Sequence, residues 1–230
     1  MELTRQILDR RRTENGEIVL WEVLLPDRGR EYEIVFNGIF LMASYCGHSS
    51  EVLVEQALQR CPGVRPLPVL IGGLGMGYSV RAALADERVG EVTVIEIEEV
   101  VVEWNRGVLA PLHGEALADR RVRLVRDDFC AFIATTPDRY DVIALDIDNG
   151  PTWLVRPANE RAYGEETLRH VRTRLTPAGV FAVWAYEEDV AFAARLQRWF
   201  PHVTVHPSTD VNPTGKVLTC FIYLAVKRPG

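Results

Sequence analysis

Residues 69–77 read VLIGGLGMG, an apolar run that ends in a loop of four glycines. The apolar run predicts a strand that is buried on both faces, and a helix is predicted after it at about 77–86. Glycine is needed where a turn is tight and where the backbone closely approaches a ligand. The segment therefore predicts the strand, loop and helix that open a ligand-binding α/β domain, with a purely structural turn as the alternative.

Strands and helices alternate after this loop. Further buried strands are predicted at 92–96, 122–125 and 142–146, with helices at about 98–109 and 129–135 between them. The remaining predicted elements are a helix near 165–175 that stops at residues 176–179, a strand at 180–186, a helix at 188–200, and strands near 202–206 and 217–226. Such alternation is typical of βαβ units. We therefore expect an α/β fold with a Rossmann-like, doubly wound and mainly parallel seven-stranded sheet.

The first sixty residues lack this alternation and predict a small β-rich appendage. Its predicted elements are a hairpin of residues 16–25 and 31–36, an Asn37-Gly38 turn before an apolar stretch at 39–42, and a helix at 51–60 capped by Ser49-Ser50. The run Arg10-Arg11-Arg12 is interpreted as the solvated end of a helix. Three prolines within residues 61–68 break any regular element. We therefore expect the hairpin appendage and linking helix at 1–62 and the Rossmann-like domain at 63–230.

Composition and charge limit the partners. Of the 230 residues, 47% are hydrophobic and 25% are charged, as in an ordinary globular protein. The formal net charge of −6 argues against a nucleic-acid partner. The four cysteines lack metal-ligand spacing and read as reduced thiols, so we expect no metal and a cytoplasmic location. The chain shows no secretory signal and no apolar run near the ~20 residues of a membrane span, so we expect no membrane partner.

Glycines and an acid end the first two strands of the predicted domain, at the edge where open α/β sheets bind ligands. The loop glycines proposed to bind a nucleoside are Gly72, Gly73, Gly75 and Gly77. Tyr78 stands where G-x-G-x-x-G needs its third glycine, which excludes the NAD fingerprint and favours a nucleoside without pyrophosphate. Glu96 follows Gly73 by 23 residues, close to the ~20-residue spacing at which an acid reaches ribose hydroxyls.

Acidic residues also end the third and fourth predicted strands. Asp127 and Asp128 are interpreted as acceptors for an adenine amine, with helix capping as the alternative. Asp146 and Asp148 are interpreted as catalytic carboxylates that bind a cationic amine and take its proton, and Asn149 as a substrate-binding amide. The alternative is a turn of Asx residues. Functional residues at four consecutive strand ends favour a binding site.

These residues resemble the spermidine synthase family of polyamine aminopropyltransferases, which share the class I S-adenosylmethionine-dependent methyltransferase fold. The resemblance covers about residues 34–185 and includes the glycine loop, VIEIE at 94–98, and the strand that leads to Asp146. It implies that Glu96 binds the ribose, that Asp128 with Asp127 holds the adenine, and that Asp146 also lies against the donor as the acid nearest the reacting amine. It further implies that Tyr163 lines the acceptor pocket, and that the chain forms a homodimer.

The sequence departs from the family at the positions that recognise the donor's tail and the acceptor. Gly75 stands where the family has an Asp, Ser49-Ser50 replaces an Asp-Glu pair, and residues 148–151 are shorter than the family's segment. The resemblance implies aminopropyl transfer from decarboxylated S-adenosylmethionine to a small-molecule amine or similar nucleophile, without a metal. A methyltransferase that uses S-adenosylmethionine and a non-catalytic nucleoside-binding module are the alternatives. Trp184 is predicted to lie in the sheet core, and Trp153 to anchor a loop or to cover the site.

Overall fold

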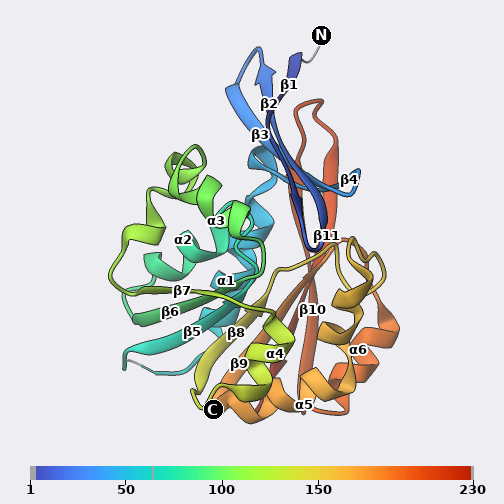
Figure 1. Ribbon diagram of the computed structural model, residues 1–230. Helices are drawn as coiled ribbons and strands as arrows, with labels where there is room; N and C mark the ends of the chain where they lie inside the picture. Colours follow the sequence, from blue (N-terminus) through green and yellow to red (C-terminus); the bar gives the residue numbers. More distant parts are fainter. Residues whose placement is uncertain (1–3, 64, 229–230) are drawn as a thin grey trace.

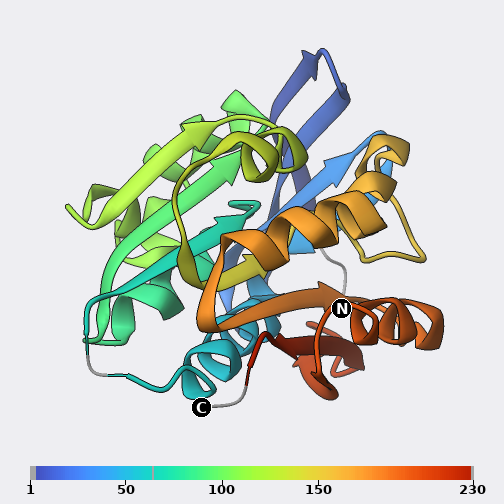
Figure 2. The same cartoon turned by 90° about the horizontal axis from the view of Figure 1, so that it is seen from below.

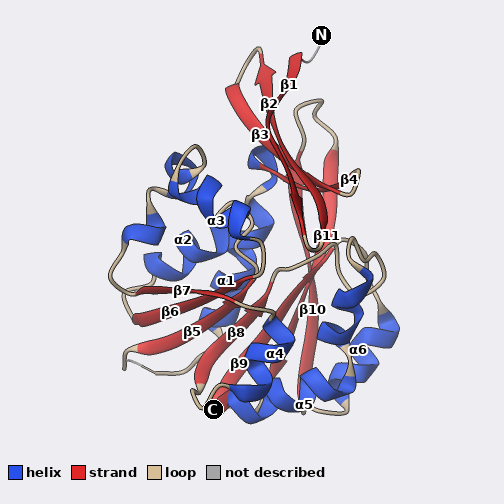
Figure 3. Ribbon diagram, in the orientation of Figure 1, coloured by secondary structure: helices blue, strands red, loops and turns tan. Residues whose placement is uncertain are grey.

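The computed structural model describes residues 4–63 and 65–228. A four-stranded antiparallel sheet stands at one end of a seven-stranded sheet that carries helices on both faces (Figures 1 and 3). The strand orders are β1-β2-β3-β4 and β10-β11-β9-β8-β5-β6-β7. The predicted doubly wound α/β fold, with seven strands in the main sheet and a β-rich appendage, is confirmed.

The N-terminal sheet consists of β1 (Thr4–Thr13), β2 (Gly16–Leu25), β3 (Gly29–Phe36) and β4 (Ile39–Ala43). Asn37 and Gly38 have positive φ values of 48° and 80°, as the tight turn between β3 and β4 requires. The helix predicted at Arg10–Arg12 is wrong, because these residues lie in the edge strand β1. Nearly all of β1 is exposed and pairs only with β2, so its sequence shows no alternation that would reveal a strand.

The seven-stranded sheet follows the predicted alternation. Its strands are β5 (Leu67–Gly72), β6 (Val89–Glu96), β7 (Val122–Arg126), β8 (Tyr140–Leu145), β9 (Leu175–Ala185), β10 (His202–Val211) and β11 (Val217–Val226). The helices are α1 (His48–Gln59), α2 (Tyr78–Ala85), α3 (Glu99–Arg106), α4 (Phe129–Thr135), α5 (Glu165–Arg174) and α6 (Val190–Gln197), with short 3-10 turns η1 (Ser44–Cys46), η2 (Ala110–His113), η3 (Ala116–Ala118) and η4 (Pro157–Tyr163). Residues 176–179, predicted to stop a helix, already belong to β9.

Helices cover both faces of the large sheet (Figure 2). The strands β5 and β8 are buried on both faces. Successive residues therefore enter different cores: Ile71 belongs to the cluster that includes residues of α1, α2 and α3, whereas Leu70 belongs to the cluster that includes residues of α4, α5 and α6. Burying one such side chain stabilises the fold by roughly 1.5–3 kcal/mol. The chain runs outward from β5 to β6 and β7 and then returns to β8 on the other side of β5. This reversal creates the crevice in which such sheets bind ligands.

The helix α1 begins earlier than predicted. It starts at His48 after Gly47, and Ser49 and Ser50 are buried in its first turn instead of capping it. The helix packs against α2 and against β8 and β9, and its core side chains join those of the N-terminal sheet in one cluster. The proposed boundary between residues 62 and 63 stays a prediction about folding units. In the described residues, no helix is long and apolar enough to span a membrane.

Candidate functional site

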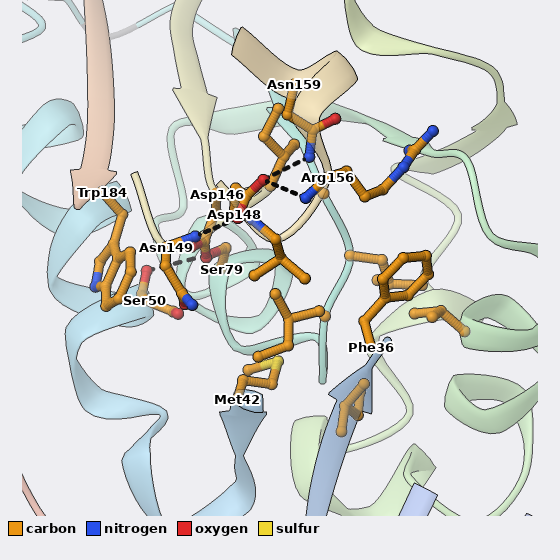
Figure 4. Close-up of a pocket in the computed structure, with 18 of the residues that line it drawn as sticks. Phe36, Met42, Ser50, Ser79, Asp146, Asp148, Asn149, Arg156, Asn159 and Trp184 are labelled. Carbon is orange, nitrogen blue, oxygen red and sulfur yellow. Dashed lines mark hydrogen bonds between the residues drawn. The ribbon is translucent and has the colours of Figure 1, made fainter. Parts of the chain in front are cut away.

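A cavity of about 320 Å³ lies between the N-terminal sheet and the carboxyl ends of β5, β6, β7 and β8. The fold brings to it eight of the residues singled out in the sequence: Gly73, Gly75, Glu96, Asp127, Asp128, Asp146, Asp148 and Asn149. Figure 4 shows Asp146, Asp148 and Asn149 on one side and Phe36 and Met42, from the N-terminal sheet, on the other. The cavity is therefore polar along the strand ends and apolar along the N-terminal sheet.

The glycine loop is shaped by close backbone contacts. Gly73 has a φ of 93°, and a Cβ at this position would lie 2.1 Å from the carbonyl oxygen of Asp146. Gly75 has a φ of 52°, and its Cβ would lie 2.6 Å from Sδ of Met42. Glycine is thus required at Gly73 by the neighbouring backbone, whereas a side chain at Gly75 would require the flexible end of Met42, from the N-terminal sheet, to move.

Two buried polar residues support the glycine loop from behind. Asn105 donates through Nδ2 to the carbonyl oxygen of Gly75 at 2.8 Å. His113 packs beneath Gly77, where an added Cβ would lie 2.5 Å from the imidazole ring. Its Nδ1 accepts from the amide of Ala116 at 3.0 Å, which leaves Nε2 to donate to the carbonyl oxygen of Asn105 at 3.2 Å. Burial lowers the pKa of His113, so the ring is held as the neutral tautomer.

Glu96 ends β6 and faces the cavity. Oε2 accepts from the amide of Leu74 at 2.9 Å and Oε1 accepts from the amide of Glu98 at 2.8 Å. Burial raises the pKa of Glu96, and these backbone bonds oppose the rise. The carboxylate thus ties the glycine loop to β6, and its remaining lone pairs are available to accept from a ligand's hydroxyls.

Asp127 and Asp128 follow β7 and line the same cavity. Asp128 accepts from the amide of Ala131 at 3.0 Å and thereby caps α4, as the capping alternative predicted. It also forms an ion pair with Arg161 at 2.7 Å. Asp127 accepts the amide of Asp128 at 2.7 Å. The helix cap therefore coexists with a position at the cavity wall, and adenine binding by the pair stays a prediction.

Asp146 follows β8 and lines the cavity beside the glycine loop. Ser79 donates to its Oδ2 at 2.9 Å, and the same hydroxyl lies 3.1 Å from the carbonyl oxygen of Ser50. Burial raises the pKa of Asp146. No arginine or lysine within residues 4–63 and 65–228 lies within the 4.0 Å of an ion pair with this carboxylate. Asp146 is therefore available to hold a cation or to take a proton.

The carboxylate of Asp148, two residues later, accepts hydrogen bonds from within its own loop. Oδ1 accepts from the amides of Asn149 at 2.8 Å and Val155 at 2.7 Å, and Oδ2 accepts from Nδ2 of Asn159 at 2.7 Å (Figure 4). The amide of Arg156 lies 3.4 Å from Oδ2. These bonds indicate that Asp148 positions the 148–159 loop, and a direct catalytic role stays a prediction.

The remaining predicted site residues lie at or behind the cavity. Asn149 lines it and donates through Nδ2 to the carbonyl oxygen of Phe40 at 3.3 Å. Gly72 and Gly77 do not line it, although both belong to the loop. Tyr163 is buried outside it and packs edge to face on Phe192, with ring centroids 5.7 Å apart. The structure therefore does not bring Tyr163 to the predicted acceptor pocket.

Aromatic residues near β9 line the cavity in its place. Trp184, predicted to be core, is half-buried and faces the cavity, and its Nε1 donates to Oγ of Ser49 at 3.1 Å. The side chain packs against the edge of the core cluster and also lines the cavity, so the core prediction is confirmed in part. Trp153 also lines the cavity and packs on Tyr186 with ring centroids 5.2 Å apart. A cover over the site, one of the two predictions for Trp153, agrees with this position.

The hairpin turn between β1 and β2 reaches the site, which no sequence signal indicated. Asn15 donates through Nδ2 to Glu98 at 2.7 Å, and its Oδ1 accepts from the guanidinium of Arg156. Farther along β1, Asp9 accepts from Nε1 of Trp104 in α3 at 3.0 Å. The N-terminal sheet is thus fastened to the end of β6, to α3 and to the 148–159 loop.

Residues 44–199 match the spermine/spermidine synthase domain. The chain belongs to this family. The matched region begins at η1 and extends past α6, so every strand end from β5 to β9 lies within it. The predicted resemblance to the spermidine synthase family is confirmed.

Curated relatives in this family include two from distant organisms. Polyamine aminopropyltransferase 2 of Pseudomonas aeruginosa is 30% identical over 170 residues, which cover 69% of this chain and 46% of that protein. The polyamine aminopropyltransferase of Saccharolobus solfataricus is 28% identical over 145 residues, which cover 63% of this chain and 47% of that protein. The chain therefore spans less than half the length of these relatives.

Solved spermidine synthase structures share the fold. A spermidine synthase in complex with the transition state analogue AdoDATO superposes with a TM-score of 0.80 at 21% identity, over 98% of this chain and 75% of that one. Spermidine synthase from Thermotoga maritima gives a TM-score of 0.79 at 20% identity, over 98% of this chain and 74% of that one. The superposition includes the N-terminal sheet as well as the large sheet.

Proposed function

We propose that the chain is a transferase that moves an aminopropyl group from decarboxylated S-adenosylmethionine to a small-molecule amine. Asp146 carries the proposal. Its carboxylate lies in the cavity beside the glycine loop, accepts from the hydroxyl of Ser79, and has no cationic partner among the described residues. Burial disfavours the ionised form of this carboxylate, and no cation of the protein compensates its charge. Such a group is suited to bind a ligand that is itself a cation.

The family relationship and the cavity together suggest how the donor binds. Glu96 would accept from the ribose hydroxyls, and Asp127 and Asp128 would lie near the adenine amine. The positive φ angles of the glycine loop favour glycine, and the missing side chains would let the nucleoside approach the backbone closely. No group of three or more potential ligands in the described chain is arranged to hold a metal ion. The proposed transfer assigns no step to a metal.

The chemistry then requires alignment and one proton acceptor. The acceptor's nitrogen attacks the carbon next to the sulfonium, so that a C–N bond forms while the C–S bond breaks and methylthioadenosine leaves. Asp146 holds the attacking amine and receives its proton. Because the sulfonium already activates the carbon, most of the rate enhancement comes from placing the two reactants in contact.

One observation favours methyl transfer as a second candidate. Gly75 replaces the acid that the family places beside the donor's tail, and Met42 fills the adjacent space. The site therefore lacks a charged group that would select the ammonium of the decarboxylated donor. S-adenosylmethionine and transfer of its methyl group remain the alternative, and a nucleoside-binding module without turnover is the third.

A product assay separates these functions. The protein is incubated with each donor and a panel of primary amines, and the nucleoside products are identified by mass. Methylthioadenosine from the decarboxylated donor is the expected result, whereas S-adenosylhomocysteine would establish methyl transfer. Nucleoside binding without any product would support the binding module.

Substitution at Asp146 tests the residue that carries the proposal. Asp146→Asn should lower kcat/KM by about 10²- to 10⁴-fold while methylthioadenosine affinity, measured by calorimetry, changes little. The matched control is Asp138→Asn at the surface, where the carboxylate lies 3.7 Å from Arg123 and half of its side chain is exposed. Full activity in the Asp146 variant would remove this residue from the mechanism.

We also propose that the protein is a cytoplasmic homodimer. All four cysteines are free, which fits a reducing compartment. The outer edge of β1 is unpaired in the single chain, and exposed apolar side chains lie along it at Ile7 and Leu8. Light scattering on the purified chain measures the oligomeric state, and Ile7→Lys should favour the monomer if this edge forms the interface.

A further inference from the structure

Asp210 brings a second acid to the cavity from the C-terminal hairpin. It lies near the end of β10, opposite Leu218 of β11, and this hairpin extends beside the N-terminal sheet (Figure 1). Along β10, Ser208 and Asp210 are buried while Thr209 and Val211 between and after them are exposed. The alternation directs Asp210 inward, where it lines the cavity and is only 8% exposed.

The carboxylate of Asp210 is poorly compensated. Oδ1 accepts from the amide of His48 at 3.1 Å, and no further hydrogen bond reaches the side chain within the described residues. Three other buried carboxylates have arginine partners at 2.6–2.8 Å, namely Glu22 with Arg30, Glu33 with Arg5 and Asp141 with Arg65. Two more, Glu96 and Asp148, have no arginine partner but each accept at least two hydrogen bonds. Neither Asp210 nor Asp146 has an arginine partner in the part of the chain that the structure describes. Both face the same cavity.

One helix end places these two acids near each other. The first residue of α1, His48, binds Asp210 through its amide, and the hydroxyl of Ser79 lies 3.1 Å from the carbonyl oxygen of Ser50 and 2.9 Å from Oδ2 of Asp146. Two residues of an α-helix advance by only about 3 Å. Cys220 lies within the influence of both: burial and the nearby charges of Asp210 and Asp146 raise its pKa to about 11. At neutral pH the thiol stays uncharged and compensates neither acid.

Apolar side chains line the cavity that contains the two acids. Trp184 donates its indole N–H to Ser49, between His48 and Ser50 in the sequence, so its ring presents carbon to the cavity. Met42 and Leu218 also line the cavity. A ligand that satisfies this arrangement has two positive groups joined by a short aliphatic stem.

We infer that Asp210 is a specificity-determining residue that binds the second cationic group of the acceptor. This inference rests on the proposed transfer at Asp146 and deepens it. The family's acidic pair is absent at Ser49-Ser50, and Asp210 supplies a negative charge to that end of α1 from a different element. Asp146 takes the reacting amine, Asp210 takes the distal ammonium, and an acceptor with one amine leaves Asp210 uncompensated.

A structural role is the competing explanation, because Asp210 also accepts an orphan amide at the start of α1. Asp210→Asn separates the two roles. The amide oxygen of asparagine still accepts from His48, while the charge is lost. Asp210→Ala removes both and measures the stabilising effect of the cap through its melting temperature.

The test compares 1,4-diaminobutane with 1-aminobutane, which share a stem and differ in one charge. Asp210→Asn should raise KM for the diamine on the order of 10- to 100-fold, with KM for the monoamine and for the donor unchanged. An equal change for both amines, or none for either, would overturn the inference. Asp138→Asn again serves as the surface control.

A binding measurement keeps this result distinct from the proposed function. Calorimetry titrates each amine into protein saturated with methylthioadenosine, without turnover. Diamine binding that the Asp210→Asn variant loses would support the role of Asp210 even if no aminopropyl group is transferred. Turnover in the wild type with an unchanged diamine preference in the variant would overturn the role of Asp210 and leave the proposed function intact.

Discussion

The carboxylates in the two halves of the cavity differ in the hydrogen bonds and ion pairs that the protein gives them. In the proposed nucleoside half, which holds the glycine loop, Glu96 receives two backbone amides and Asp128 receives one amide and an arginine. In the proposed acceptor half, Asp146 receives only the hydroxyl of Ser79 and Asp210 receives one amide, and neither has an arginine or lysine partner among the described residues. The first half is assembled by the protein alone, whereas the second has charges that a cationic ligand would complete.

This difference teaches that a conserved fold can fix one substrate's site more firmly than another's. The glycine loop is held by β5, β6, Asn105 and His113. The acceptor half is assembled from the N-terminal sheet, α1, the 148–159 loop and the C-terminal hairpin. Parts from four separate elements can change independently, so acceptor preference can diverge while the nucleoside site persists.

The largest effect on stability is expected from a substitution at Gly73, where the glycine loop packs against the backbone of Asp146. Gly73→Ala places a methyl group against the carbonyl oxygen of Asp146, 2.1 Å away, and should cost about 3–4 kcal/mol of unfolding free energy. Methylthioadenosine binding should be lost. Gly215→Ala is the matched control, because its φ is 82° and no atom lies within 4 Å of the added Cβ. It should cost about 1–2 kcal/mol. Equal costs in urea unfolding would mean that β5 and β8 can separate.

Two carboxylates two residues apart should respond to the same substitution with opposite signs. Asp148→Asn turns one hydrogen-bond acceptor into a donor that faces Nδ2 of Asn159, and should destabilise the fold by about 1–3 kcal/mol. Asp146→Asn removes a charge that burial disfavours, and should raise Tm at pH 7 by roughly 2–4 °C.

The sign for Asp146 follows from its raised pKa. The folded state prefers the protonated acid, so the stabilisation that this proton provides is lost as pH rises through the folded pKa. The Tm difference between Asp146→Asn and the wild type should therefore grow as pH rises from 4 to 7. A decrease over this range would show that the ionised form is compensated, and that the two halves do not differ.

A pair of substitutions, at Gly75 and Met42, tests the position where the two halves of the cavity meet. Gly75→Asp alone meets Met42 and should weaken donor binding. Combined with Met42→Ala, the new acid has space and should improve affinity for the decarboxylated donor, relative to methylthioadenosine, by roughly tenfold. Aspartate tolerates the positive φ of 52° better than most residues. Additive effects in calorimetry would show that Met42 does not control this position.

The smallest expected effect is on pH-dependent stability behind the glycine loop. His113 is buried with a lowered pKa, so the unfolded state binds a proton more readily. Stability should fall as pH drops below the ordinary histidine pKa of about 6.5 toward the folded value, by at most about 1.4 kcal/mol per pH unit. His113→Gln should flatten this slope, and His202→Gln, at an exposed position, should not. An identical slope in both variants would mean that His113 is protonated in the fold.

Local sequence predicted the elements that are buried on two faces. The apolar strands, the glycine loop and the alternating helices are recognisable because each strand between helices must be apolar throughout. β1 was missed, since an exposed edge strand with Arg10–Arg12 shows no pattern of burial. The predicted core position of Trp184 is confirmed in part, because its side chain packs against the core cluster. Its second role, as part of the cavity wall, cannot be seen in the local sequence, because nothing there reveals that β9 ends at a cavity.

By itself, the sequence determined the fold class, the strand ends that carry Gly73, Glu96, Asp128 and Asp146, and the absence of a dinucleotide fingerprint at Tyr78. These depend on the periodicity and spacing of neighbouring residues. Only the tertiary structure decided that Asp148 ties a loop, that Tyr163 lies away from the cavity, and that Asp210 enters it. Such roles depend on contacts between residues far apart in the chain, as between His48 and Asp210, and on whether a buried charge finds a partner there.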